Sequence, residues 1–189
     1  MNSSKNKNLN LEEKLINSEY IYKGKILNLR KDSVLLPNGK TSTREIIEHN
    51  GAAAILAINN NNEVLLVKQY RCPFKEVLTE IPAGKLEKGE NPKLAALREL
   101  EEETGYKANN IKLLLECYPS PGAFCEKLYI YLATNLEQTE QHLDSDEFLN
   151  VFKVPLSMLK EQILKGEIKD AKTVISVLSF IEKEKEKEN

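Results

Sequence analysis

One short segment, residues 91–105, limits what this chain can fold into more than any other. Asn91 is a suitable N-cap, and the proline after it is well placed for the first position of a helix. Good helix formers fill the next two to three turns, and Gly105 is a typical helix terminator. The pattern therefore predicts a single helix over residues 92–104.

The end of this predicted helix is crowded with glutamates. At about 100° per residue, Glu99, Glu102 and Glu103 fall on one face, whereas Glu101 points elsewhere. Three carboxylates on one face repel each other, and they lie at the end of the helix where the dipole is negative. A bound divalent cation would relieve both effects, because Mg²⁺ takes hard oxygen ligands and keeps positions for water and phosphate. Taken alone, the string also allows an exposed, glutamate-rich surface helix with basic neighbours.

The residues on either side of the helix distinguish these alternatives. Gly84 is followed after five residues by Glu90, and after seven more by residues 98–106, Arg-Glu-Leu-Glu-Glu-Glu-Thr-Gly-Tyr. This arrangement resembles the Nudix box at every fixed position, and the box is itself a loop–helix–loop unit. The resemblance implies an α/β (α+β) fold, specifically the Nudix α/β/α sandwich with a mixed sheet and an N-terminal antiparallel β-sheet arm. It also gives Glu90 a supporting role.

The resemblance implies a metal-dependent site on this helix. The helix carboxylates of the family bind Mg²⁺, or Mn²⁺, at a pyrophosphate. Glu99 and Glu103 are the expected ligands, with Glu102 acting directly or through water, and the main-chain carbonyl of Ala83 is a further ligand. Arg98 is expected to orient the carboxylates through charge-assisted hydrogen bonds. Two or three ions would bridge the phosphates and activate a water, without a covalent intermediate.

A second acidic segment supplies the candidate general base. In the branch that this chain resembles, a glutamate on a loop beyond the box takes the proton of the attacking water or completes a metal site. The matching segment reads Asp-Ser-Asp-Glu-Phe over residues 144–148. Glu147 lines up with one family carboxylate, but Ser145 stands where a second acid is expected. Either Glu147 acts alone, or Asp144 or Asp146 substitutes, and a plain acidic loop is the remaining alternative.

Other positions indicate the substrate. Pro121 stands sixteen residues beyond Gly105, a spacing associated in the family with ADP-ribose hydrolysis. Arg44 and Arg71 match positions that contact the nucleotide or its phosphates, although a salt bridge on an edge strand is the alternative for Arg71. Glu80 is a further expected substrate contact. The resemblance implies Mg²⁺-dependent hydrolysis of ADP-ribose to AMP and ribose 5-phosphate. A GDP-mannose or other nucleotide-sugar pyrophosphatase, or a non-catalytic ADP-ribose-binding sensor module, is the alternative. The segments that resemble the ADP-ribose pyrophosphatase branch are residues 23–26, 36–39, 44–49, 69–71, 80–84 and 170–173.

The remaining chain predicts strands and two closing helices around the acidic helix. Residues 1–48 carry too few strands to be stable alone, and the resemblance makes them the dimerisation arm of a homodimer. Residues 49–189 would form the Nudix hydrolase domain. The predicted strands are 19–23, 26–36, 41–48, 52–58, 64–70, 111–118, 127–134 and 149–154, and the helices are 155–165 and one from 170. Two hairpins are expected, one joining 26–36 to 41–48 and one joining 52–58 to 64–70.

Composition excludes other classes of protein. The 27 basic and 29 acidic residues leave no basic stripe, which argues against a nucleic-acid partner. No apolar run approaches the roughly 18 residues of a membrane span, and the polar first ten residues do not resemble a signal peptide. Three widely spaced cysteines suit a reducing compartment, where they are expected to be small buried hydrophobes. We therefore expect a cytoplasmic protein with a small-molecule substrate and no membrane association.

Overall fold

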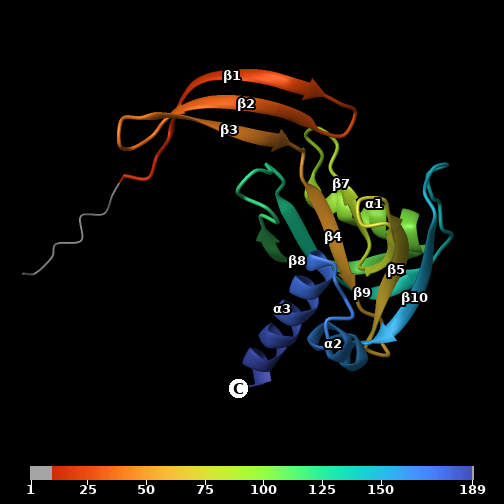
Figure 1. Cartoon of the computed structure of the whole chain (residues 1–189). Helices are drawn as coiled ribbons and strands as arrows, with labels where there is room; N and C mark the ends of the chain where they lie inside the picture. The colour runs from red at the N-terminus through yellow and green to blue at the C-terminus, as the bar shows by residue number, and fades with distance from the viewer. Residues whose placement is uncertain (1–9, 189) are drawn as a thin grey trace, which may run out of the picture. The chain divides into compact units, whose positions relative to one another are not determined.

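The computed structural model describes residues 10–188 of the chain, and these form two compact units. The N-terminal unit comprises the described residues up to His49 together with Ser120–Glu126. The core unit comprises the other described residues, from Asn50 to Pro119 and from Lys127 onwards. Most elements of the two units are labelled in Figure 1.

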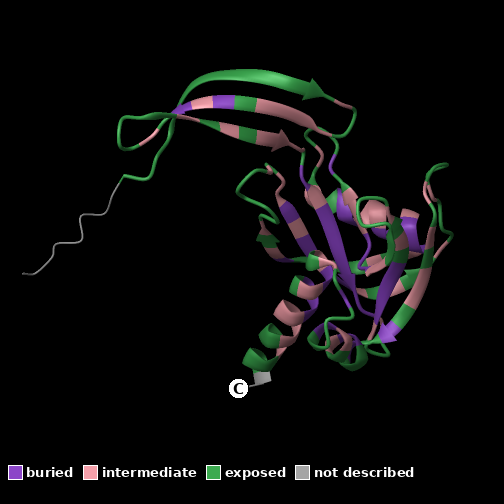
Figure 2. Ribbon diagram, in the orientation of Figure 1, coloured by how far each residue is buried: buried purple, intermediate pink, exposed green. Residues whose placement is uncertain are grey.

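The N-terminal unit is built on one antiparallel sheet with the strand order β1-β2-β3. The predicted turn joins β2 to β3, where the Leu36 N–H donates to the Lys40 carbonyl over 2.8 Å and Gly39 has a positive φ of 80°. The predicted N-terminal antiparallel sheet and its hairpin are therefore confirmed. Every residue of β1 is exposed (Figure 2), and β1 begins earlier than predicted. The strands are β1 (Lys14–Lys23), β2 (Asn28–Leu35) and β3 (Thr41–Glu48).

The core unit contains two sheets and three helices. One sheet has the order β7-β4-β9-β8 and is mixed, because β4 and β9 run parallel while the other neighbours run antiparallel. The other sheet has the antiparallel order β10-β5-β6. The strands are β4 (Ala52–Ala57), β5 (Glu63–Arg71), β6 (Glu76–Glu80), β7 (Ala83–Lys85), β8 (Tyr106–Cys117), β9 (Leu128–Gln138) and β10 (Leu149–Pro155), and the helices are α1 (Pro92–Thr104), α2 (Leu156–Leu164) and α3 (Ala171–Glu188).

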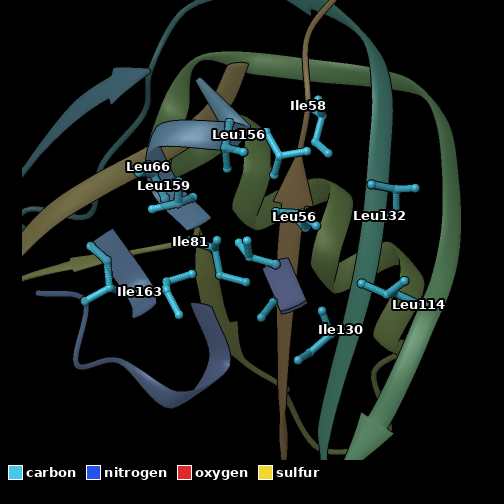
Figure 3. Close-up of a cluster of buried hydrophobic side chains, with 14 of the residues drawn as sticks. Leu56, Ile58, Leu66, Ile81, Leu114, Ile130, Leu132, Leu156, Leu159 and Ile163 are labelled. Carbon is cyan, nitrogen blue, oxygen red and sulfur yellow. The ribbon is translucent and has the colours of Figure 1, made fainter. Parts of the chain in front are cut away.

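The alternation of side chains along β4 shows how the layers are arranged. Ala54 and Leu56 point into a cluster that includes Leu159 of α2 and residues of α3 (Figure 3). Ala53 and Ile55 point into a second cluster that α1 closes. Because β4 is covered on both faces, it is apolar at every position rather than at alternate ones. Helices on both sides of the sheet confirm the predicted α/β/α sandwich.

The second predicted hairpin is wrong. Strands β4 and β5 follow one another in the chain, but they belong to different sheets and share only an isolated bridge between Ile58 and Val64. The residues of β5 pair instead with β10 and β6. Both strands are apolar along most of their length, so their patterns carry no information about which neighbour each one takes.

The local signals around α1 and α3 are confirmed. The Asn91 side chain accepts hydrogen bonds from the first-turn N–H groups of α1, and Gly105 ends the helix in the left-handed conformation at φ 68°. Along α3, Val177 is fully buried, and the other residues of the predicted stripe pack against the same core cluster. The exposed far end of α3 carries Glu–Lys ion pairs one turn apart.

Two further expectations concern membrane-spanning helices and the burial of the cysteines. No helix in the described part of the chain is long and apolar enough to cross a membrane. The expectation that the cysteines are buried is wrong for Cys72 and Cys125, which are exposed. Both lie in loops outside the strands, where few neighbours can cover a side chain.

Candidate active site

The first carboxylate of the acidic face, Glu99, lies directly against β7. A Cβ atom on Gly84 would be only 1.8 Å from Oε1 of Glu99, so no side chain fits at position 84 while the carboxylate is there. The glycine thus lets helix α1 bring a carboxylate onto the backbone of β7. This explains in steric terms why a glycine occupies position 84, at the start of the predicted loop–helix unit.

Glu103 is the most deeply buried member of this face. It is only 2 % exposed, and its Oε2 accepts a hydrogen bond from the Ala83 N–H over 3.0 Å. Burial, together with the nearby charges of Glu147 and Glu99, raises the pKa of Glu103 to about 8 in spite of the Ala83 hydrogen bond. Burial also raises the pKa of Glu99. In the absence of a cation, the protein surroundings of the acidic face therefore disfavour the charged form of both carboxylates.

Arg98 links the carboxylates to the loop before the helix. Its Nη1 lies 2.9 Å from Glu99 and 2.8 Å from Glu102, and its Nε lies 3.2 Å from Glu90. Glu90 also accepts the Glu87 N–H, and this bond and Arg98 hold its pKa below the usual range in spite of some desolvation. One guanidinium thus ties the loop and two helix carboxylates together, which is the arrangement that an orienting role for Arg98 requires.

The C-terminal end of α1 is closed by a segment that sequence reasoning missed. The Gln141 side-chain amide donates to the Glu103 carbonyl over 2.6 Å, and the His142 N–H donates to the Glu102 carbonyl over 3.0 Å. These donors satisfy carbonyls that have no partner within the helix and oppose the negative end of its dipole. Polar residues in a loop carry no local signal for such a contact.

A buried ion-pair network lies at the end of β6. Glu80 is 1 % exposed, and Arg71 donates to it twice, from Nε at 2.6 Å and from Nη2 at 2.7 Å. Lys172, on α3, also pairs with Glu80 and lies 2.9 Å from Asp170. Burial alone would raise the pKa of Glu80, but Arg71 and Lys172 outweigh it and hold the pKa below its usual range. Glu80 is therefore a charged group that orients two cations, and sequence reasoning missed its partner Lys172.

Glu147 lies near the acidic face of α1. It is half-buried, and Gln69 on β5 lies 3.5 Å from its Oε1. Its charge contributes to the raised pKa of both Glu99 and Glu103, which places it within electrostatic reach of both. Asp144, Ser145 and Asp146 are exposed in the same loop. Of the acidic candidates in the loop, Glu147 thus has the geometry that best fits a role at this site.

The residues present fit a hard divalent cation. In the structure as it stands, no three Asp, Glu, His or Cys side chains among residues 10–188 converge closely enough to hold a metal ion. The reason is visible in the contacts: Glu99 and Glu102 turn to Arg98, and Glu103 turns to the Ala83 N–H. Carboxylates and a main-chain carbonyl are nevertheless the oxygen donors that Mg²⁺ takes. A cation bound at the acidic face would offset the burial and the mutual repulsion that disfavour the charged carboxylates.

Two predicted substrate contacts, Arg44 and Pro121, belong to the N-terminal unit. The Arg44 guanidinium pairs with Glu13 and donates to the Thr43 carbonyl over 2.9 Å. Pro121 lies in an exposed turn that the Phe124 N–H closes by donating to the Ser120 carbonyl over 3.0 Å. Their contacts with a substrate stay predictions.

Comparison with known proteins agrees with the geometry of α1. The family model for the NUDIX domain matches residues 48–176, which is more than half of the chain, so the protein belongs to the Nudix family. A second model, described as the nucleoside diphosphate sugar hydrolase N-terminal domain, matches residues 13–47. The pair of matches places the chain in the branch of the family that carries this N-terminal sheet, as the resemblance predicted.

Several individual proteins are similar over most of their length. The ADP-ribose pyrophosphatase of Bacillus subtilis is 46 % identical over 169 residues, which cover 88 % of this chain and 91 % of that protein. The methanol dehydrogenase activator of Bacillus methanolicus is 46 % identical over 168 residues, with the same coverage of 88 % and 91 %. A GDP-mannose pyrophosphatase of Salmonella choleraesuis is 31 % identical over 149 residues, 74 % of this chain and 77 % of that protein. The crystal structure of an ADP compounds hydrolase shares the fold, with a TM-score of 0.82 at 21 % identity over 94 % of this chain and 97 % of that one.

Proposed function

We propose that this protein hydrolyses the pyrophosphate bond of ADP-ribose to AMP and ribose 5-phosphate in a reaction that depends on Mg²⁺, or on Mn²⁺ in its place. The observation that carries the proposal is the acidic face of α1, where Glu99 lies against Gly84 and Glu103 lies on the Ala83 N–H. The 46 % identity to an ADP-ribose pyrophosphatase supports the choice of substrate.

The metal would be held by Glu99, Glu103 and the Ala83 carbonyl, with Glu102 acting directly or through water. When bound, the metal supplies charge neutralisation at the diphosphate and a lowered pKa for the attacking water. Arg98 fixes the positions of these carboxylates relative to each other, since it contacts Glu99 and Glu102 at once. Removing Arg98 would leave those groups free to rotate away.

Glu147 is the proposed general base. Its carboxylate takes a proton from the water that attacks phosphorus, and the phosphoanhydride P–O bond then breaks, so that one phosphate remains on each product. Two observations support this role over Asp144 or Asp146. The Glu147 carboxylate contacts the Gln69 side chain, and its charge contributes to the raised pKa of Glu103.

Arg71 is proposed to bind the substrate through a phosphate oxygen. Two of its nitrogens are held by Glu80, which sets the plane of the guanidinium, and Nη1 is the part of the fork that would meet a phosphate. In this proposal Glu80 acts on the substrate by orienting Arg71.

The N-terminal unit is proposed to act as the dimerisation arm, bringing Arg44 and Pro121 to the substrate in a homodimer. The exposure of β1 supports this, because Leu15, Ile21 and Tyr22 are each more than half exposed on a strand that pairs with β2 on one side and forms the edge of its sheet. The division of the chain near residue 48, the cytoplasmic location, and the absence of nucleic-acid and membrane partners stay predictions.

A product assay tests the proposed function. The purified protein is incubated with ADP-ribose and Mg²⁺, and AMP and ribose 5-phosphate are quantified, with GDP-mannose as the competing substrate. The catalytic variant is Glu103→Gln, and the matched control is Glu101→Gln, since Glu101 is on the same helix but pairs with Lys107 at 3.0 Å. We expect metal-dependent AMP formation that only Glu103→Gln abolishes. Binding of ADP-ribose without turnover would instead identify a sensor module, and preferential cleavage of GDP-mannose would reassign the substrate.

A further inference from the structure

The connection between β6 and β7 leads directly to Ala83, whose carbonyl is the candidate metal ligand, and three different elements hold this segment. The Ile81 N–H donates to the Thr173 hydroxyl over 2.8 Å, and the Pro82 carbonyl accepts the Ile55 N–H over 2.9 Å. The Ala83 N–H donates to Glu103, as described above. The Ile81 side chain is fully buried in the core cluster (Figure 3). Helix α3, strand β4 and helix α1 therefore jointly set the position of three consecutive residues.

In the hydrogen bond between Ile81 and Thr173, the contacts of the Thr173 hydroxyl decide which group donates. Thr173 is fully buried, and its hydroxyl donates its single proton to Oδ2 of Asp170 over 2.6 Å. The hydroxyl oxygen can then accept from the Ile81 N–H. Ile81 therefore donates to Thr173, and Thr173 donates to Asp170. Asp170 also accepts the Thr173 N–H over 2.9 Å and so caps the start of α3.

Neighbouring contacts strengthen the same junction. Lys172 pairs with Glu80, and the Thr173 hydroxyl accepts from the Ile81 N–H. Two consecutive residues of α3 thus contact the last residue of β6 and the residue that follows it. Each contact joins residues 92 positions apart in the chain. The first turn of α3 is thus attached to the segment that leads into the metal site two residues later.

We propose that Thr173, oriented by Asp170, is a positioning residue for the metal site: it sets where the Ala83 backbone lies relative to Glu103. The proposal rests on the proposed function, because it takes Ala83 as a metal ligand. Without the hydroxyl, a buried N–H of Ile81 is left without its partner, and the connection shifts to recover one. A ligand set tolerates displacements of only about 0.5 Å, so a small shift of Ala83 weakens metal binding.

The test compares three variants of one helix. Thr173→Val replaces the hydroxyl by a methyl group of similar size, and Thr173→Ser restores the hydroxyl. Ser176→Ala is the matched control, because Ser176 is equally buried one turn later, but its hydroxyl bonds to the Thr173 carbonyl within α3 over 3.0 Å. Binding of Mn²⁺ is measured without substrate by the electron paramagnetic resonance of the free ion, alongside the Mg²⁺ midpoint for turnover and the thermal unfolding curve.

We expect Thr173→Val to weaken Mn²⁺ binding by about tenfold and to raise the Mg²⁺ midpoint equally, as loss of a group that supports a ligand does. Thr173→Ser should return both values to within about twofold of the wild type, and Ser176→Ala should change only the unfolding temperature. If Thr173→Val does not fold, Thr173→Ala makes the same comparison with a smaller side chain.

The outcomes separate the two proposals. A wild-type protein that binds no Mn²⁺ contradicts the proposed function itself. A wild-type protein that binds Mn²⁺, with Thr173→Val or Thr173→Ala binding it as well as Ser176→Ala does, leaves the proposed function intact and overturns the role of Thr173.

Discussion

The carboxylate of Glu99 fills the space that a side chain at position 84 would need, since a Cβ on Gly84 would come within 1.8 Å of its Oε1. The same loop–helix unit contains Gly89, which has a positive φ of 80° and no atom within 4 Å of where a Cβ would be. The two glycines therefore serve different purposes, one steric and one conformational.

The first prediction follows from this difference. Gly84→Ala should displace Glu99 and lower turnover by about a hundredfold or more, as misplacement by about 1 Å does in other active sites. Gly89→Ala should cost about 1 kcal/mol of stability through its backbone conformation and leave turnover unchanged. Steady-state kinetics and thermal unfolding measure both effects, and equal activity of the two variants would contradict the steric role of Gly84.

The second prediction concerns Glu103 in the metal-free protein. Its folded-state pKa is raised to about 8, so the folded state holds the proton more tightly than the unfolded chain, and stability falls as pH rises from the ordinary pKa of a glutamate through 8. Glu103→Gln cannot ionise and still accepts the Ala83 hydrogen bond. With a chelator present, this variant should therefore unfold at a higher temperature than the wild type at about pH 9, and at a similar temperature at about pH 4.

Added Mg²⁺ provides the control for that experiment. The metal should stabilise the wild type and not Glu103→Gln, because the variant lacks a charged ligand. Turnover of the variant should fall by orders of magnitude. Unfolding curves of wild type and variant that coincide at every pH, with and without Mg²⁺, would falsify both the buried, ionisable state of Glu103 and its role as a metal ligand.

The third prediction tests the general base. Glu147→Gln should lower kcat by a factor of about 10² to 10⁴ and remove the acidic limb of the pH–rate profile, since an amide cannot take a proton. Asp146→Asn is the control, because Asp146 is exposed in the same loop and should leave the profile unchanged. A fully active Glu147→Gln enzyme would exclude Glu147 from proton transfer, and loss of the acidic limb in Asp146→Asn would move the role there.

The fourth prediction concerns the buried ion pairs of Glu80. Arg71 and Lys172 lower its folded-state pKa below the unfolded value, so Glu80 contributes stability that is present above the unfolded pKa and is lost as pH falls through the folded one. Glu80→Gln should therefore unfold at a lower temperature than the wild type at neutral pH, and the two should converge in acid. A difference that stays constant down to strongly acidic pH would show that packing, and not charge, makes the contribution.

Kinetics of the same variant test the link to the substrate. Because Glu80 holds two nitrogens of Arg71, its loss should raise the KM for ADP-ribose by about tenfold, the value of one charge-assisted hydrogen bond. An unchanged KM would indicate that Arg71 does not contact the substrate.

Local chemistry made much of the candidate site predictable. The cap at Asn91, the terminator at Gly105 and the spacing of the glutamates between them are short-range rules, and the structure follows each of them. The contact of Arg98 with Glu102 is equally local, because four residues along a helix bring two side chains to the same face.

Long-range partners could not be predicted in this way. Strands β4 and β5 follow one another in the chain and both carry an apolar run, and nothing in their patterns places them in different sheets. The contacts of Lys172 with Glu80 and of Gln141 with Glu103 join segments 92 and 38 residues apart, and the residue types involved are common on protein surfaces.

By itself, the sequence determined one capped helix and the acidic face that this helix presents, because both depend on backbone geometry within a few turns. Only the tertiary structure decided which carboxylate is buried, which cations compensate the others and which helix holds the segment before Ala83. Burial and charge compensation depend on what the rest of the chain packs against a residue, and that packing is a property of the whole core unit.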